Sequence, residues 1–349
     1  MIPELTDGAL AALFGMGGGI VLGLAARLGR FCTLGAIEDY LYADSDTRLR
    51  MWGMAIGVAM IASFGLIGFG YLDINQIFYL DYGWSPVASI GGGLIFGYGM
   101  ALAGNCGFGA LARLGGGDMR AFVVVLVLGV CALITLSGPL AEVRLAVTEL
   151  TNLPTVSRGY SDLIAQSLSV PAHIPGLVVG ILIAGYCLTA AKFRTDPKAV
   201  FWASAVGLAV ASGWAGTQWI ATTGFDDIAV VSHTFSAPPG DTLLYLMTSS
   251  AGGINFGIGS VAGVLIGALI GSLIKGHFRW EACEDPRELR RQILGAAMMG
   301  VGAVFALGCT IGQGVSAFSV LAFSAPVVFV SIFAGCSLGL RRLIEGIHA

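Results

Sequence analysis

Long apolar runs separated by short polar segments dominate the chain. About nine of these runs reach or approach the roughly 20 residues that a helix needs to cross the hydrocarbon core of a bilayer. They are residues 9–29, 51–71, 88–104, 120–138, 174–191, 199–219, 253–274, 292–308 and 325–344. The pattern therefore predicts an all-α polytopic membrane protein.

Four shorter apolar or half-apolar segments adjoin these runs. They are residues 33–42, 107–115, 243–251 and 311–321, and glycines lie close to each of them. Interrupted helices of this kind are typical of transporters, in which the breaks line the substrate path. We therefore expect about four short re-entrant helices beside the spans.

Composition supports the membrane assignment. Hydrophobic residues make up 56% of the chain and charged residues only 11%, whereas soluble domains carry about 25% charged residues. The formal net charge of -3 leaves no basic face for nucleic acid. Glycine accounts for 53 of the 349 residues, about twice the usual share of ~7%, and this excess predicts helices that pack backbone to backbone or are broken within the membrane.

The distribution of basic residues predicts the orientation in the membrane. If the N-terminus is outside and the nine runs alternate in direction, all but two of the 18 Lys and Arg residues lie on the inner side, and the exceptions are Arg144 and Arg158. This is the bias that the positive-inside rule requires. We expect a multi-pass protein of the bacterial inner membrane with a periplasmic N-terminus and a cytoplasmic C-terminus.

Two segments repeat one motif with opposite orientation. GYGMALAGNCGFG, from Gly97 to Gly109, and GVGAVFALGCTIG, from Gly300 to Gly312, both read G-x-G, six residues, Cys, two residues, Gly. The preceding spans cross in opposite directions under the predicted topology, which is the pattern of inverted-repeat transporters. The predicted organisation is a first membrane repeat over 1–138, a periplasmic linker over 139–173 and a second membrane repeat over 174–349.

Cysteine stands at three junctions between a long and a short helix. Cys106 and Cys309 belong to the repeated motif, and Cys32 lies in RFCTLGAIEDY. At such a junction the first N–H groups of the short helix are unpaired and the positive end of its dipole faces the break, so three converging ends make an anion site without Lys or Arg. Neutral thiols there favour an anion with an exposed terminal sulfur over sulfate.

The residues next to these cysteines complete the candidate substrate site. Asn105 and Gln313 are candidates either for amide donors to the anion or for helix caps, whereas Thr33 and Thr310 are expected to be N-caps. Arg113 either draws anions toward the exit or only contributes to the inner positive charge. The candidate substrate-binding residues are Cys32, Asn105, Cys106, Gly107, Gly109, Cys309, Thr310, Gly312 and Gln313.

Other uses of cysteine are less well supported. Cys131, Cys187 and Cys336 lie within predicted spans and are expected to be packing residues. The chain has no C-x-x-C motif and only four histidines, so we expect no metal site and no cofactor. It also lacks the G-x-x-x-x-G-K-[ST] pattern of ATP-hydrolysing proteins.

The segments RFCTLGAIEDY, GYGMALAGNCGFGALARLGGGDMRA and GCTIGQGVSAF resemble the YeeE/YedE family of sulphur-transport proteins, in particular its thiosulfate-uptake members. The resemblance extends over nearly the whole chain. It implies an hourglass-shaped transporter, not an enzyme, that relays thiosulfate past Cys32, Cys106 and Cys309. It also implies a TusA-like cytoplasmic sulfurtransferase as a partner.

Three other functions remain open at this point. The protein could be a membrane sulfurtransferase or sulfur-signalling protein that carries sulfane sulfur to a cytoplasmic partner. It could import another sulfur or selenium species. It could also be a general channel for small anions, with the cysteines as packing residues.

Overall fold

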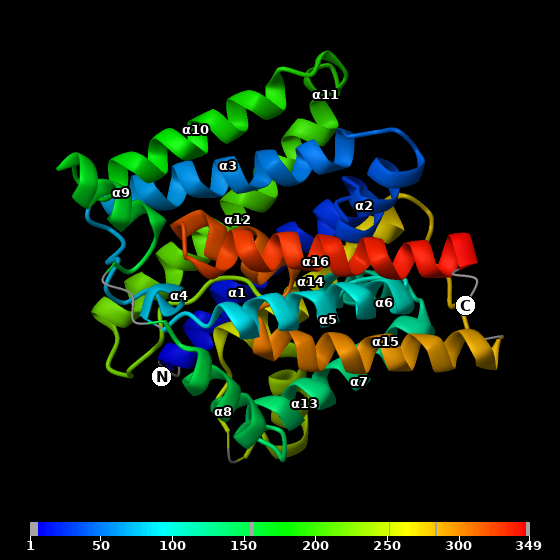
Figure 1. Cartoon of the computed structure of the whole chain (residues 1–349). Coiled ribbons are helices and arrows are strands. Elements are labelled where there is room, and N and C mark those ends of the chain that lie inside the picture. The colour runs from blue at the N-terminus through cyan, green and yellow to red at the C-terminus, as the bar shows by residue number, and fades with distance from the viewer. Residues whose placement is uncertain (1–5, 82, 154–156, 251, 283–284, 347–349) are drawn as a thin grey trace.

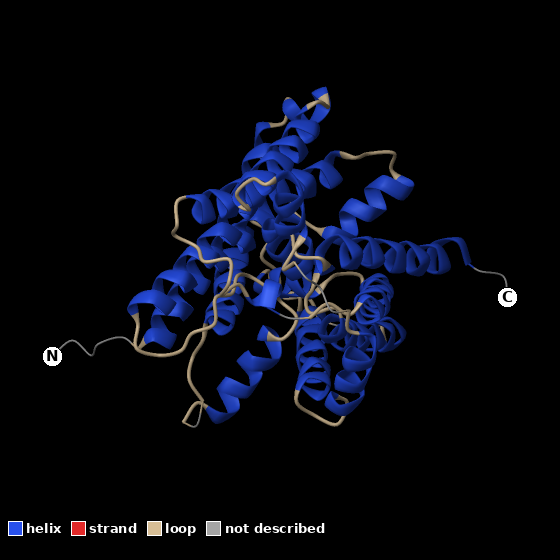
Figure 2. Cartoon of the chain, turned by 60° about the vertical axis from the view of Figure 1, so that its left-hand side comes forward, coloured by secondary structure: helices blue, strands red, loops and turns tan. Residues whose placement is uncertain are grey.

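The computed structural model describes residues 6–346 except 82, 154–156, 251 and 283–284. Within those ranges the protein is built from helices and connecting loops, with three isolated β-bridges and no strand (Figure 2). The predicted all-α fold class is confirmed.

Each predicted apolar run corresponds to one long helix. These are α1 (Asp7–Leu28), α3 (Thr47–Gly68), α5 (Pro86–Ala103), α7 (Met119–Leu136), α10 (His173–Leu188), α12 (Pro197–Thr223), α14 (Phe256–Ile274), α15 (Pro286–Phe305) and α16 (Ser324–Arg341). In the described part of the chain, seven segments are long and apolar enough to cross a membrane, or eight if the bent pair of α9 (Tyr160–Leu168) and α10 forms one span. The predicted number of nine is not confirmed, because α10 has only 16 residues and the first turns of α15 are polar.

Short helices follow four of the long ones. They are α2 (Thr33–Tyr42), α6 (Gly107–Gly115), α13 (Pro238–Thr248), and the π-helix η1 (Gly312–Ala317) continued by the 3-10 helix η2 (Phe318–Val320). The bounds of α2 and α6 are those predicted. The expectation of 243–251 for the third was wrong, because the helix begins at two prolines. Proline is well tolerated in a first helical turn, where the N–H groups have no partner within the helix.

Helix pairing follows a regular pattern. Helix α1 packs along α14 and α12, α3 packs along α12, α5 packs between α15 and α16, and α7 packs on α15 (Figure 1). Four helices of the first half correspond in order to four of the second: α1 to α12, α3 to α14, α5 to α15 and α7 to α16. When each helix is replaced by its counterpart, the pair α1–α14 becomes α12–α3 and the pair α5–α16 becomes α15–α7. Both resulting pairs are also in contact. An inverted repeat, which stays a prediction, would produce this exchange.

The elements outside this pattern are peripheral. Helix α10 lies along the outer side of α3 (Figure 1), and the predicted linker contains α8 (Ala141–Thr151) as well as α9. Helix α8, which has no buried residue, was not predicted. Two short turns, α4 (Phe78–Asp81) and α11 (Ala191–Arg194), complete the helices, and residues 342–346 extend α16 as the π-helical turn η3 (Arg342–Gly346).

Glycine brings α1 and α14 into backbone contact. On α14, Gly259, Gly263 and Gly267 recur at every fourth position, and a Cβ at each would lie 1.9, 2.2 and 2.2 Å from a carbonyl oxygen of α1. Close approach through small residues four apart is typical of helix pairs in membranes. Part of the glycine excess is explained by this packing.

Candidate functional site

Each of the three junction cysteines immediately precedes a short helix. Cys32 and Cys106 are the N-cap residues of α2 and α6, with extended backbone, and Cys309 directly precedes the helical turn that starts at Thr310. The expectation that Thr33 and Thr310 are N-caps was therefore wrong. Both threonines occupy the first helical position, because it is the cysteine that adopts the non-helical conformation of a cap.

Two of the thiols accept backbone N–H groups at these helix starts. The Cys106 Sγ accepts from Gly109 at 3.3 Å. The Cys309 Sγ accepts from Gly312 at 3.4 Å and from Phe235 at 3.1 Å. Two of the predicted site glycines, Gly109 and Gly312, therefore contribute N–H groups that point at sulfur, while Gly107 begins α6. The positive helix ends face the thiols as expected from helix geometry.

The three thiols form a series in space. Cys106 lies within electrostatic range of both Cys32 and Cys309. Cys106 and Cys309 are fully buried, while Cys32 is partly exposed. We call the closed region around Cys106 and Cys309 the neck, because a cavity opens on each side of it.

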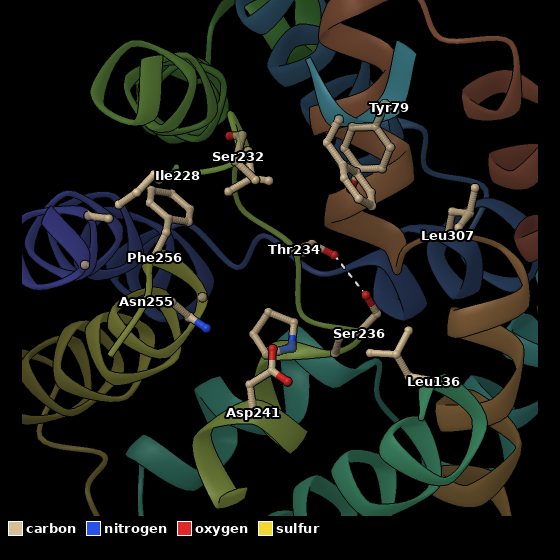
Figure 3. Close-up of a pocket in the computed structure, with 18 of the residues that line it drawn as sticks. Tyr79, Leu136, Ile228, Ser232, Thr234, Ser236, Asp241, Asn255, Phe256 and Leu307 are labelled. Atoms are coloured by element: carbon tan, nitrogen blue, oxygen red, sulfur yellow. Dashed lines mark hydrogen bonds between the residues drawn. The ribbon is translucent and has the colours of Figure 1, made fainter. Parts of the chain in front are cut away.

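One cavity, which we call the acidic cavity, has a volume of about 480 Å³ and includes Thr234, which contacts Cys309, in its wall. Its polar lining includes Ser232, Thr234, Ser236, Asp227 and Asp241, and no Lys or Arg of the described residues belongs to it. Figure 3 shows Thr234 bonded to Ser236 at 3.1 Å in the middle of this lining. The Thr234 Oγ1 lies 3.8 Å from the Cys309 Sγ, so this cavity leads directly to the first buried thiol.

The second cavity, which we call the basic cavity, has a volume of about 320 Å³ and opens on the other side of the neck. Cys32, Asn105 and Gly109 lie in its wall. Its charged lining consists of Arg27, Arg30, Arg48, Arg113 and Lys275. Only Arg48 among them forms a described ion pair, with Asp39 at 3.1 Å. Partial burial and the charges of Arg30 and Arg27 lower the pKa of Lys275, which shows how closely these cations are gathered.

An extended segment between α12 and α13, residues 229–237, completes the neck. The His233 Nδ1 lies 2.7 Å from the Ser260 Oγ, and the His233 carbonyl accepts a hydrogen bond from Ser316 at 2.6 Å. These bonds place the Phe235 N–H on the Cys309 sulfur. The sequence analysis missed this segment, since it carries no repeat or motif and reaches Cys309 across more than 70 residues of chain.

The two candidate amides differ in their surroundings. The Gln313 Nε2 donates to the carbonyls of Ala306 and Leu307 at 2.9 and 3.2 Å, and its Oε1 accepts from Ser324 at 3.0 Å. Gln313 thus covers the carbonyl of the C-cap residue of α15, Ala306, and the one after it, which corresponds to the capping alternative. Asn105 is 4% exposed, lines the basic cavity and has no partner for its Oδ1.

A fourth cysteine, Cys336 on α16, lies close to the series. It is fully buried and within electrostatic range of Cys32 and Cys106. The sequence placed it within a span, and nothing in its local pattern distinguished it from Cys131 and Cys187. Despite this concentration of thiols, no group of three His, Cys, Asp or Glu in the described ranges could hold a metal ion.

Comparison with known proteins agrees with this geometry. The family model described as "Sulphur transport" matches residues 28–338. The thiosulfate transporter TsuA of Spirochaeta thermophila is 24% identical over 324 residues, covering 89% of this chain and 94% of the relative. The thiosulfate transporter TsuA of Escherichia coli is 25% identical over 332 residues, covering 91% and 90%. The family and these relatives are transporters rather than enzymes. The resemblance seen in the sequence is thereby confirmed, and the chain belongs to the sulphur-transport family of membrane proteins.

Proposed function

We propose that this protein imports thiosulfate across the bacterial inner membrane. The observation that carries the proposal is the series of thiols, each at the start of a short helix, between two cavities of opposite charge character. The names of the two relatives support thiosulfate as the substrate. The positive-inside rule supports a cytoplasmic position for the basic cavity.

The proposed route runs from the acidic cavity to the basic cavity. The anion enters from the periplasm, meets Cys309 beside Thr234, passes Cys106 and leaves past Cys32 and Asn105. Helix N-terminal N–H groups around Gly107, Gly109, Thr310 and Gly312 offset its charge in the neck. Gln313 keeps the turn before Cys309 in place.

Selectivity in this proposal comes from the thiols. A neutral thiol is a weak donor with a polarisable sulfur, so it interacts favourably with a terminal sulfur and holds it loosely enough for release. No covalent bond to the substrate is needed, and the cysteines return unchanged after each passage.

The remaining features of the proposal concern organisation and partners. Residues 1–138 and 174–349 form the two membrane repeats around the neck, and 139–173 forms the periplasmic linker. A TusA-like sulfurtransferase that collects the anion at the basic cavity would keep its cytoplasmic concentration low.

Uptake of radiolabelled thiosulfate into proteoliposomes tests the proposal. We expect uptake that excess sulfate does not suppress, and a loss of at least tenfold in Cys106→Ala or Cys309→Ala, since each removes a contact in a path with no alternative. Cys131→Ala is the matched control, because this half-exposed thiol lies on α7 away from both cavities.

Two results would contradict thiosulfate import by the thiol series. Wild-type rates in both neck variants would show that the thiols only pack. Absence of uptake by folded protein, together with a stable persulfide on one neck cysteine in mass spectra, would favour a membrane sulfurtransferase or sulfur-signalling protein.

A further inference from the structure

Thr33 and Thr310 are buried hydroxyls that lack hydrogen bonds. In the part of the chain that the structure describes, four threonine side chains are buried, namely Thr33, Thr135, Thr217 and Thr310. Thr135 and Thr217 bond carbonyls four residues earlier, at 2.8 and 2.9 Å. The hydroxyls of Thr33 and Thr310 have no partner, although burial without one is costly.

The position of these two threonines explains why they remain unpaired. A threonine inside a helix can bond the carbonyl of the preceding turn. Thr33 and Thr310 are each the first helical residue after a cysteine, so no preceding turn exists. Both side chains lie beside Cys106 in the neck.

Both hydroxyls converge on one thiol. Each faces the Cys106 sulfur without forming a well-aligned hydrogen bond to it. Thr33 is 4% exposed and Thr310 is 0% exposed, so no bulk water satisfies them. A thiol is a weak hydrogen-bond partner, which leaves two hydroxyl protons free for a passing anion.

We infer that Thr33 and Thr310 form a subsite that binds the oxygen atoms of a tetrahedral sulfur oxyanion while its terminal sulfur faces the neck thiols. The inference rests on the proposed function and adds an assignment of the two ends of the substrate. Hydroxyl donors form short, strong bonds to charged oxygens, and they add no fixed positive charge that would trap a dianion. One subsite therefore recognises the oxygens that thiosulfate shares with sulfate, and the thiols recognise the sulfur that sulfate lacks.

The test compares isosteric variants in uptake and in equilibrium binding. Thr33→Val and Thr310→Val keep the shape of the side chain and remove the hydroxyl. We expect each to weaken thiosulfate binding about ten- to a hundredfold, as loss of one hydrogen bond to a charged group would. Thr33→Ser and Thr310→Ser should restore binding, and Thr135→Val, whose hydroxyl is already paired within α7, should bind like wild type.

Sulfate is the second probe, because it presents oxygens and no terminal sulfur. Its equilibrium binding, which is too weak to suppress thiosulfate uptake, should decrease in the valine variants and persist in Cys106→Ala. Unchanged binding of both anions in the two valine variants, with uptake by wild type intact, would overturn the hydroxyl subsite alone. Failure of wild-type protein to bind or take up thiosulfate would instead overturn the proposed function, and the subsite with it.

Discussion

Gly18 and His233 show how one small residue fixes the geometry of the neck. The His233 imidazole is fully buried, and a Cβ at Gly18 would lie 2.1 Å from its Nε2. Because the other ring nitrogen is bonded to Ser260, the ring cannot turn away without breaking that bond. Gly18 is therefore needed to keep residues 229–237 against Cys309.

Gly18→Ala should destabilise the protein by about 1–3 kcal/mol, the usual cost of overpacking, and should lower thiosulfate uptake by displacing the Phe235 N–H. Gly17→Ala is the matched control, since a Cβ there meets nothing within 4 Å and alanine favours a helix. Thermal unfolding in detergent and uptake in proteoliposomes give the two readouts. Equal behaviour of the two variants would contradict the role given to Gly18.

Single residues of the site were partly predictable from sequence. The repeated motif identified Cys106, Cys309 and their glycines, because the spacing of a cap and its N–H donors is local. The threonines were misassigned because Thr is usually a better N-cap residue than Cys. Here the cysteine that precedes the short helix adopts the extended backbone conformation of the cap. Phe235 escaped notice because its contact with Cys309 joins distant parts of the chain.

At the scale of elements, the pairing of α1 with α14 supports the whole bundle. A Cβ at Gly263 would lie 2.2 Å from the Met16 carbonyl oxygen, and a main-chain atom cannot move aside as a side chain can. The two helices also carry the residues that surround His233, so their separation affects the neck.

Gly263→Ala should therefore lower the thermal unfolding temperature in detergent by several degrees, in line with an overpacking cost of about 1–3 kcal/mol. Gly65→Ala on α3 should have no such effect, because no atom lies within 4 Å of its Cβ position. A Gly263→Ala protein as stable as wild type would show that the two helices can separate freely.

The bounds of helices were predictable where the amino-acid composition changes abruptly along the chain. The bounds of α2 and α6 followed from their apolar residues and nearby glycines. The start of α13 was missed because paired prolines suggest a loop, and α8 was missed because its half-polar composition provides no membrane signal. The number of spans depends on α10 and α15, whose length or polar first turns make a sequence count ambiguous.

At the scale of the whole molecule, the two cavities differ in charge, and this difference predicts a dependence on pH. Asp241 lines the acidic cavity on α13, outside the candidate spans. Burial raises the pKa of its carboxyl above the usual range. The other titratable residues of the described lining are Asp227 and Tyr79, and neither supplies a positive charge.

Protonation of Asp241 removes a negative charge from the entrance, so uptake of a dianion should rise by roughly threefold or more as the external pH falls from neutral to mildly acidic. Asp241→Asn should give the faster rate at both pH values. Asp227→Asn should keep the rise. A pH response in Asp241→Asn as large as in wild type would exclude Asp241 as its source.

The closed neck between cavities of unequal charge also has an energetic consequence. Moving a dianion into a cell with a negative interior requires electrical work of about 2.3 kcal/mol per charge for each 100 mV. Fixed arginines in the basic cavity would attract the anion under the proposed route, but they are present before and after every passage and supply no net work. Unless passage is coupled to another gradient, net import therefore continues only while the anion is consumed in the cytoplasm, and it should slow when that consumption stops.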